Sequence, residues 1–118
     1  MKSVVIIDDH EEMATLLERF FKRFDAVDTK TFSDPERGLS YLQANRVDLV
    51  VSDITMPKLD GIALLKKIKE IKPELQVIMI TAEASLDRVL KSHKYDAEDF
   101  LLKPVNLHEL ERKVKKIL

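Results

Sequence analysis

Short apolar runs alternate with amphipathic helical patterns along the whole chain, and this alternation limits the folds that the chain can adopt. Runs of strand length occur at 4–7, 48–53, 76–81 and 99–103. The run at 27–32 is more polar and β-branched, which suits a strand at the edge of a sheet. The first, third and fourth strands in chain order are almost wholly apolar, as is typical of parallel strands covered on both faces.

Between these runs, apolar residues recur at the three- and four-residue spacing of an amphipathic helix. Asp34, Asp60 and Asn106 are predicted N-caps, and Pro35 suits the first helical turn. Five β-α units in succession predict an α/β fold, with helices on both faces of one five-stranded parallel sheet. The predicted helices cover 11–24, Pro35 to Leu42, Asp60 to the residues before Pro73, 85–93, and Asn106 to Ile117.

Composition excludes several classes of function. Lys and Arg number 20 against 21 Asp and Glu, and this balance does not suggest broad binding of nucleic acid or an anionic membrane, while it leaves open a local charged site. The absence of cysteine excludes disulfides, thiolate catalysis and cysteine-ligated zinc. No apolar run approaches the roughly 18 residues of a membrane span. We therefore expect one cytoplasmic domain over 1–118, without membrane insertion or direct nucleic-acid contact.

Polar residues stand at the ends of four predicted strands, at the edge where open α/β sheets bind ligands. Carboxylates held close together repel one another, and Mg²⁺ relieves that repulsion while also binding phosphate oxygens. A lysine and a threonine beside them suit the oxygens of a phosphoryl group. We therefore predict phosphoryl transfer to a carboxylate. The residues at this edge are Asp8, Asp9, Asp53, Thr81 and Lys103.

Four segments together point to a family. They are IIDD at 6–9, SDITMPKLDG at 52–61, ITAE at 80–83 and FLLKP at 100–104. With these segments in this order, essentially all of the chain resembles the response-regulator receiver domain of two-component signalling. The resemblance implies the flavodoxin-like receiver fold, with the strand order 2-1-3-4-5.

The resemblance also implies how the acceptor and the metal are held. Asp53 would accept a phosphoryl group from a histidine kinase or a phosphotransfer protein. Asp9 and Asp53 would bind Mg²⁺ directly, and Mn²⁺ would substitute for it. Asp8 would act through a metal-bound water, and the backbone carbonyl of Thr55 would be a further ligand.

Further residues would carry the switch and set its lifetime. By the same resemblance, Thr81 and Lys103 would bind the phosphoryl oxygens, and Phe100 would be the switch aromatic. Thr55 and Glu83 would tune the rate of autodephosphorylation. The surface of the fourth helix, fifth strand and fifth helix would then change for an unknown downstream protein target. The chain would thus be a phosphoacceptor signalling domain rather than an enzyme with a separate substrate.

Two local features concern the segments around the fifth strand. The family usually has Gly-Ala before this strand, whereas this chain has Asp96-Ala97. Aspartate is among the few residues that tolerate positive φ, so we expect modest strain or a shifted loop with function intact. The resemblance also implies a cis peptide bond between Lys103 and Pro104.

Two other functions remain open at this point. A phosphatase of the haloacid-dehalogenase type also uses an aspartate after a strand, but a second aspartate normally stands where this chain has Thr55. A pure interaction module with the same fold would bind neither Mg²⁺ nor a phosphate mimic. A dinucleotide protein is excluded because the only glycines, Gly38 and Gly61, do not follow the first strand.

The three histidines, His10, His93 and His108, lack the spacing of a metal site, so we expect them at the surface. His10 stands beside the acidic pair, which leaves open a contact with the outer shell of the predicted site. The lysine-rich final helix is expected to present a solvated face.

Overall fold

The computed structural model describes residues 1–53, 61–81, 99–102 and 105–118. The helix predicted over 85–93 lies outside these ranges, and so does the Asp60 cap. No helix in the described ranges is long and apolar enough to cross a membrane. In chain order, the elements are β1 (Lys2–Ile7), α1 (Glu11–Phe21), β2 (Val27–Phe32), α2 (Pro35–Ala44), β3 (Leu49–Asp53), α3 (Gly61–Ile71), β4 (Gln76–Thr81), β5 (Asp99–Leu102) and α5 (Leu107–Ile117).

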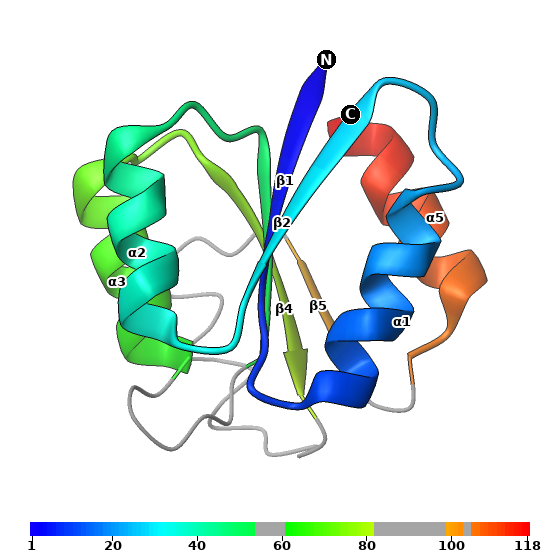
Figure 1. The fold of residues 1–118 in the computed structure, drawn as a ribbon, viewed down its shortest axis with the longest axis horizontal. Helices are drawn as coiled ribbons and strands as arrows, with labels where there is room; N and C mark the ends of the chain where they lie inside the picture. The colour runs from blue at the N-terminus through cyan, green and yellow to red at the C-terminus, as the bar shows by residue number, and fades with distance from the viewer. Residues whose placement is uncertain (54–60, 82–98, 103–104) are drawn as a thin grey trace.

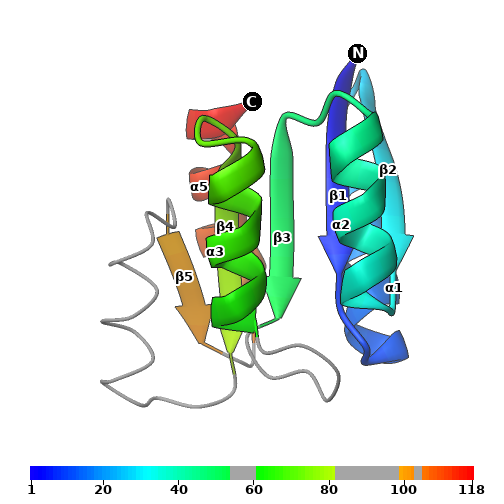
Figure 2. The ribbon, with the colours of Figure 1, turned by 90° about the vertical axis from the view of Figure 1, so that its left-hand side faces the viewer.

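The strands form one five-stranded sheet in the order β2-β1-β3-β4-β5, and every neighbouring pair is parallel. Helices α2 and α3 cover one face of this sheet, while α1 and α5 cover the other (Figure 1). The predicted doubly wound α/β fold and its strand order are therefore confirmed. Because the strands are parallel, their carboxyl ends meet at one edge of the sheet, to which the arrowheads of β1, β3 and β5 point (Figure 2).

Two apolar layers, one on each face, fix the central strands. Successive side chains of a strand point to opposite faces, so Val5 and Ile7 enter one layer while Val4 and Ile6 enter the other. All four of these side chains are fully buried, which explains why β1 is apolar at every position from Val4 to Ile7. The α2/α3 layer also contains Leu42, Leu64, Leu65 and Ile68, and the α1/α5 layer contains Leu17, Phe20, Phe21, Leu110 and Val114.

The structure confirms the two predicted N-caps that lie in the described ranges, Asp34 and Asn106. Asp34 Oδ1 accepts a hydrogen bond of 2.9 Å from the backbone N–H of Glu36, and Pro35 is the first residue of α2. Asn106 Oδ1 accepts one of 3.1 Å from the backbone N–H of Glu109. Each cap satisfies a backbone donor that the first turn of the helix leaves without an intrahelical partner.

The prediction that the first helix reaches Phe24 is wrong by three residues. Helix α1 ends at Phe21, and the N–H groups of Arg23 and Phe24 then donate to carbonyls three residues earlier, as in a tightened final turn. Phe24 nevertheless packs against the α1/α5 layer. The apolar spacing therefore identified a residue of the core correctly, although the backbone there is no longer helical.

A pair of reciprocal contacts joins β1 to the start of β3 at the amino edge of the sheet. The backbone N–H of Ser3 donates to Asp48 Oδ2 at 2.8 Å, and the N–H of Asp48 donates to the carbonyl of Ser3 at 2.8 Å. Arg46 Nη2 lies 3.3 Å from Asp48 Oδ1. These contacts help to fix the register in which Val4 lies beside Leu49.

Helix α2 packs tightly against β1 at Gly38. A Cβ atom added at Gly38 would lie 2.7 Å from Ile7 Cδ1 and 3.0 Å from Ile7 Cγ1. Ile7 is fully buried, so its side chain has little room to move away. The glycine therefore sets how near α2 can lie to β1, the strand that precedes Asp8.

We predict that Gly38→Ala lowers the free energy of unfolding by about 1 kcal/mol. Overpacking costs roughly 1–3 kcal/mol, which exceeds the gain in helix propensity of about 1 kcal/mol. In an Ile7→Val background, which removes the Cδ1 atom, the same substitution should be neutral or stabilising. Denaturant unfolding of the four proteins measures this coupling, and additive effects would contradict the proposed contact.

Candidate metal centre

The pairing of β1 with β3 brings three aspartates together at the carboxyl edge of the sheet. Ile7 lies opposite Ser52 in the register, so Asp8 and Asp53 follow as neighbours on adjacent strands. Asp8 and Asp53 are each only 2% exposed. Asp9 begins the connection to α1, and its side chain is 26% exposed.

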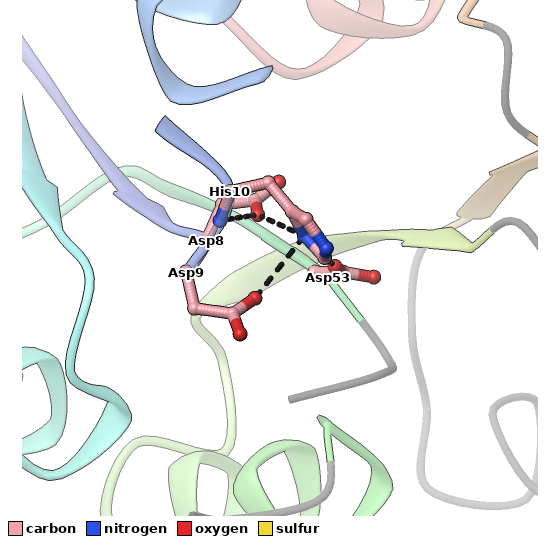
Figure 3. Close-up of side chains that lie close together, drawn as sticks. All are labelled: Asp8, Asp9, His10 and Asp53. Atoms are coloured by element: carbon pink, nitrogen blue, oxygen red, sulfur yellow. Dashed lines mark hydrogen bonds and ion pairs between the residues drawn. The ribbon is translucent and has the colours of Figure 1, made fainter. Parts of the chain in front are cut away.

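The three carboxylates converge on the ring of His10 (Figure 3). His10 Nδ1 lies 3.2 Å from Asp8 Oδ1, 3.1 Å from Asp9 Oδ1 and 3.2 Å from Asp53 Oδ2. The backbone N–H of His10 also donates to Asp8 Oδ1 at 2.8 Å. One oxygen of each aspartate and a ring nitrogen of His10 all lie within 4.8 Å of one another.

This arrangement fits a divalent cation. At an effective dielectric constant of about 20, two unit negative charges about 5 Å apart repel by roughly 3 kcal/mol. A ring nitrogen carries at most one hydrogen, so Nδ1 cannot donate good hydrogen bonds to three carboxylates at once. Asp9 Oδ1 is buried and accepts no hydrogen bond in the described part of the chain. A hard cation such as Mg²⁺ takes several carboxylate oxygens at the same time.

The structure places some of the predicted site residues at this edge. Asp8, Asp9 and Asp53 lie together, Thr81 ends β4, and Phe100 belongs to β5. The roles given to these residues stay predictions. Thr55, Glu83 and Lys103 lie outside the described residues, as do Asp96 and the bond between Lys103 and Pro104.

The sequence left open a contact of His10 with the outer shell of the site, but it did not predict that one ring nitrogen would contact all three carboxylates. The side chain of His10 is 58% exposed, as expected for a surface residue, yet its Nδ1 atom faces the aspartates. The sequence does carry a local signal for this contact. An aspartate often accepts a hydrogen bond from the N–H group two residues later, and Asp8 accepts such a bond from His10.

The chain belongs to the response regulator receiver domain family, whose sequence profile matches residues 4–115. Receiver domains of this family are parts of two-component response regulators. Among curated relatives, the chain is similar to the alkaline phosphatase synthesis transcriptional regulatory protein PhoP of Bacillus subtilis, with 35% identity over 99% of this chain and 48% of the relative. The chain spans less than half the length of such curated relatives as PhoP of Bacillus subtilis.

Solved structures agree with this assignment. A CheY-like receiver domain protein from Methanospirillum hungatei superposes with a TM-score of 0.92 at 27% identity, covering 98% of this chain and 92% of that one. The beryllofluoride-activated NtrC4 receiver domain dimer gives a TM-score of 0.92 at 27% identity, covering 99% of this chain and 96% of that one.

We predict that Asp9→Asn raises the free energy of unfolding by roughly 1–2 kcal/mol in buffer without divalent ions, because it removes one of three repelling charges. With Mg²⁺ present, the wild type should have the higher free energy of unfolding. Mg²⁺ at about 100 times its dissociation constant would stabilise the wild type by about 2.7 kcal/mol, and the variant by much less. Thermal unfolding with and without Mg²⁺ measures both effects.

Asp28→Asn is the matched control, because Asp28 is an exposed aspartate on β2. It should respond to Mg²⁺ as the wild type does. Equal Mg²⁺ stabilisation of Asp9→Asn and the wild type would rule out Asp9 as a ligand.

Proposed function

We propose that the chain is a phosphoacceptor receiver domain over residues 1–118, in which Asp53 takes a phosphoryl group from a histidine kinase or a phosphotransfer protein. The convergence of Asp8, Asp9 and Asp53 at the carboxyl edge of the sheet carries this proposal. The family supports it, since receiver domains act within two-component systems. The similar NtrC4 receiver domain, solved in a beryllofluoride-activated state, supports activation of this fold by a small anion.

The transfer step forms a bond between a carboxylate oxygen of Asp53 and phosphorus, and breaks the bond between phosphorus and the donor's histidine nitrogen. The electron pair of the broken bond stays on that nitrogen. Asp9, Asp53 and the backbone carbonyl of Thr55 would hold Mg²⁺, or Mn²⁺ in its place, with Asp8 acting through a water. When bound, the ion supplies positive charge that offsets the charge of the phosphoryl oxygens.

Residues from the neighbouring strands complete the proposed site. Thr81 would donate its hydroxyl to a phosphoryl oxygen, and Lys103 would contribute a compact positive charge. Strands β4 and β5 end at the same edge as β1 and β3, which supports a shared site. On phosphorylation, Thr81 would move inward and Phe100 would turn into the space behind it.

The proposed output is a protein contact. The surface of the fourth helix, β5 and α5 would change on phosphorylation and bind a downstream protein target. Phosphoryl transfer and autodephosphorylation are here a signalling cycle of a cytoplasmic domain, rather than turnover of a separate substrate. Neither nucleic acid nor a membrane takes part in the proposed contacts of this chain, which carries a formal net charge of -1.

We predict that the intact protein gains the mass of one phosphoryl group, about 80 Da, after incubation with acetyl phosphate and Mg²⁺. The gain should disappear in Asp53→Asn and on removal of Mg²⁺. Intact-protein mass spectrometry makes the measurement, and Asp28→Asn should be labelled normally. A gain that persists in Asp53→Asn would overturn the assignment of the acceptor.

We also predict that substitutions at Thr55 and Glu83 change the lifetime of the aspartyl phosphate more than they change Mg²⁺ binding. The resemblance places both side chains beside the phosphoryl group, where they would control the approach of water. The decay of the labelled mass, followed over time, gives the lifetime, and calorimetry gives the Mg²⁺ affinity. Lifetimes equal to that of the wild type would contradict this role.

A further inference from the structure

We propose that His10 is a ligand of the metal centre through Nδ1, and that this nitrogen makes the centre prefer a divalent first-row transition ion, such as Co²⁺ or Ni²⁺, over Mg²⁺. This inference rests on the proposed metal site at Asp8, Asp9 and Asp53. It adds a residue to that site and a different class of ion.

The ring of His10 is directed at the carboxylates by the local backbone. His10 is the N-cap of α1, with extended backbone angles, yet its side chain makes no capping hydrogen bond to the helix. Its own N–H is instead held by Asp8 Oδ1 at 2.8 Å, which forms a tight turn after β1. The imidazole is therefore free of the capping role and faces the three aspartates (Figure 3).

The distances suit ligands of one ion. Neighbouring ligands around a six-coordinate ion with bonds of about 2.1 Å lie about 3.0 Å apart. His10 Nδ1 is 3.1 to 3.2 Å from one oxygen of each aspartate, so it stands beside each of them at close to this spacing. All four atoms fit within 4.8 Å, which is close to the span of about 4.2 Å between opposite ligands of such an ion.

The type of donor decides the preference between ions. Carboxylate oxygens alone suit Mg²⁺, whereas an imidazole nitrogen favours ions such as Co²⁺, Ni²⁺ and Zn²⁺. A lone pair on Nδ1 that faces three carboxylates would be repelled by their negative charges. A cation bound between these atoms attracts both the nitrogen and the carboxylate oxygens, so all of them become its ligands. His108 offers a contrast within the same chain, because it is an exposed residue of α5 and belongs to no such cluster among the described residues.

Calorimetric titration of the full chain with Mg²⁺ and with Co²⁺ tests the preference. The wild type should bind Co²⁺ more tightly than Mg²⁺. His10→Ala should lose about tenfold or more in Co²⁺ affinity, while its Mg²⁺ affinity changes by less than about threefold. His10→Asn, which keeps a side chain suited to the N-cap, should behave like His10→Ala, and the matched control His108→Ala should behave like the wild type.

Pulsed electron paramagnetic resonance of the Mn²⁺-loaded protein provides a second readout that depends on no activity. A directly bound imidazole gives nitrogen modulation, which should be present in the wild type and in His108→Ala, and lost in His10→Ala. An unchanged ratio of the two affinities, or no nitrogen signal in the wild type, would overturn the role of His10.

Tighter binding of both ions by His10→Ala would also overturn it, because His10 would then compete with the ion. The proposed metal site itself is judged separately by Asp9→Asn. If Asp9→Asn binds neither Mg²⁺ nor Co²⁺ while the wild type binds both, the metal site is supported, whichever result His10→Ala gives. If the wild type binds neither ion, both the metal site and the role of His10 are refuted.

Discussion

Crowding of like charges at the carboxyl edge of β1 and β3 is the constraint on which the rest of the structure depends. Asp8 and Asp53 are almost fully buried, and each close pair of carboxylates costs roughly 3 kcal/mol in the absence of a cation. Strands β1 and β3 carry these aspartates and tolerate this cost because an apolar layer packs against each face of the sheet. Val4 to Ile7 are fully buried, and burial of each such side chain contributes roughly 1.5–3 kcal/mol. A well-packed sheet thus holds together groups that would otherwise separate.

The sequence was sufficient for the architecture because the signals for it are local. The apolar runs predicted β1, β3 and β4, and Asp34 and Asn106 marked helix starts through hydrogen bonds within their own first turns. The missed start of β1 depends on a contact between distant segments. Strand β1 begins at Lys2, before the apolar run, because it pairs there with Val27 of β2. No periodicity within β1 itself could reveal this pairing.

The candidate site also has a part that could be predicted from the sequence and a part that could not. Asp8, Asp9 and Asp53 could be predicted to meet, because parallel strands deliver their carboxyl ends to one edge. The three contacts of His10 could not be predicted from the spacing of the histidines, although the neighbouring aspartates left a contact with the site open. Its contact arises from one turn, in which the N–H of His10 binds Asp8 and carries the imidazole over the aspartates. Contacts that a turn creates are therefore not visible in the spacing of one residue type.

The reciprocal contacts between Ser3 and Asp48 have a consequence for the fidelity of folding. Side chains alternate between the two layers with a period of two, so a slip of β3 by one residue would exchange the layers and turn Asp53 toward α2 and α3. Such a slip would also separate the Asp48 carboxylate from the Ser3 N–H, which it accepts at 2.8 Å across 45 residues of sequence. Asp48 thus favours the native register of β1 and β3. It does so from the amino edge of the sheet, and this register places Asp53 beside Asp8 at the opposite edge.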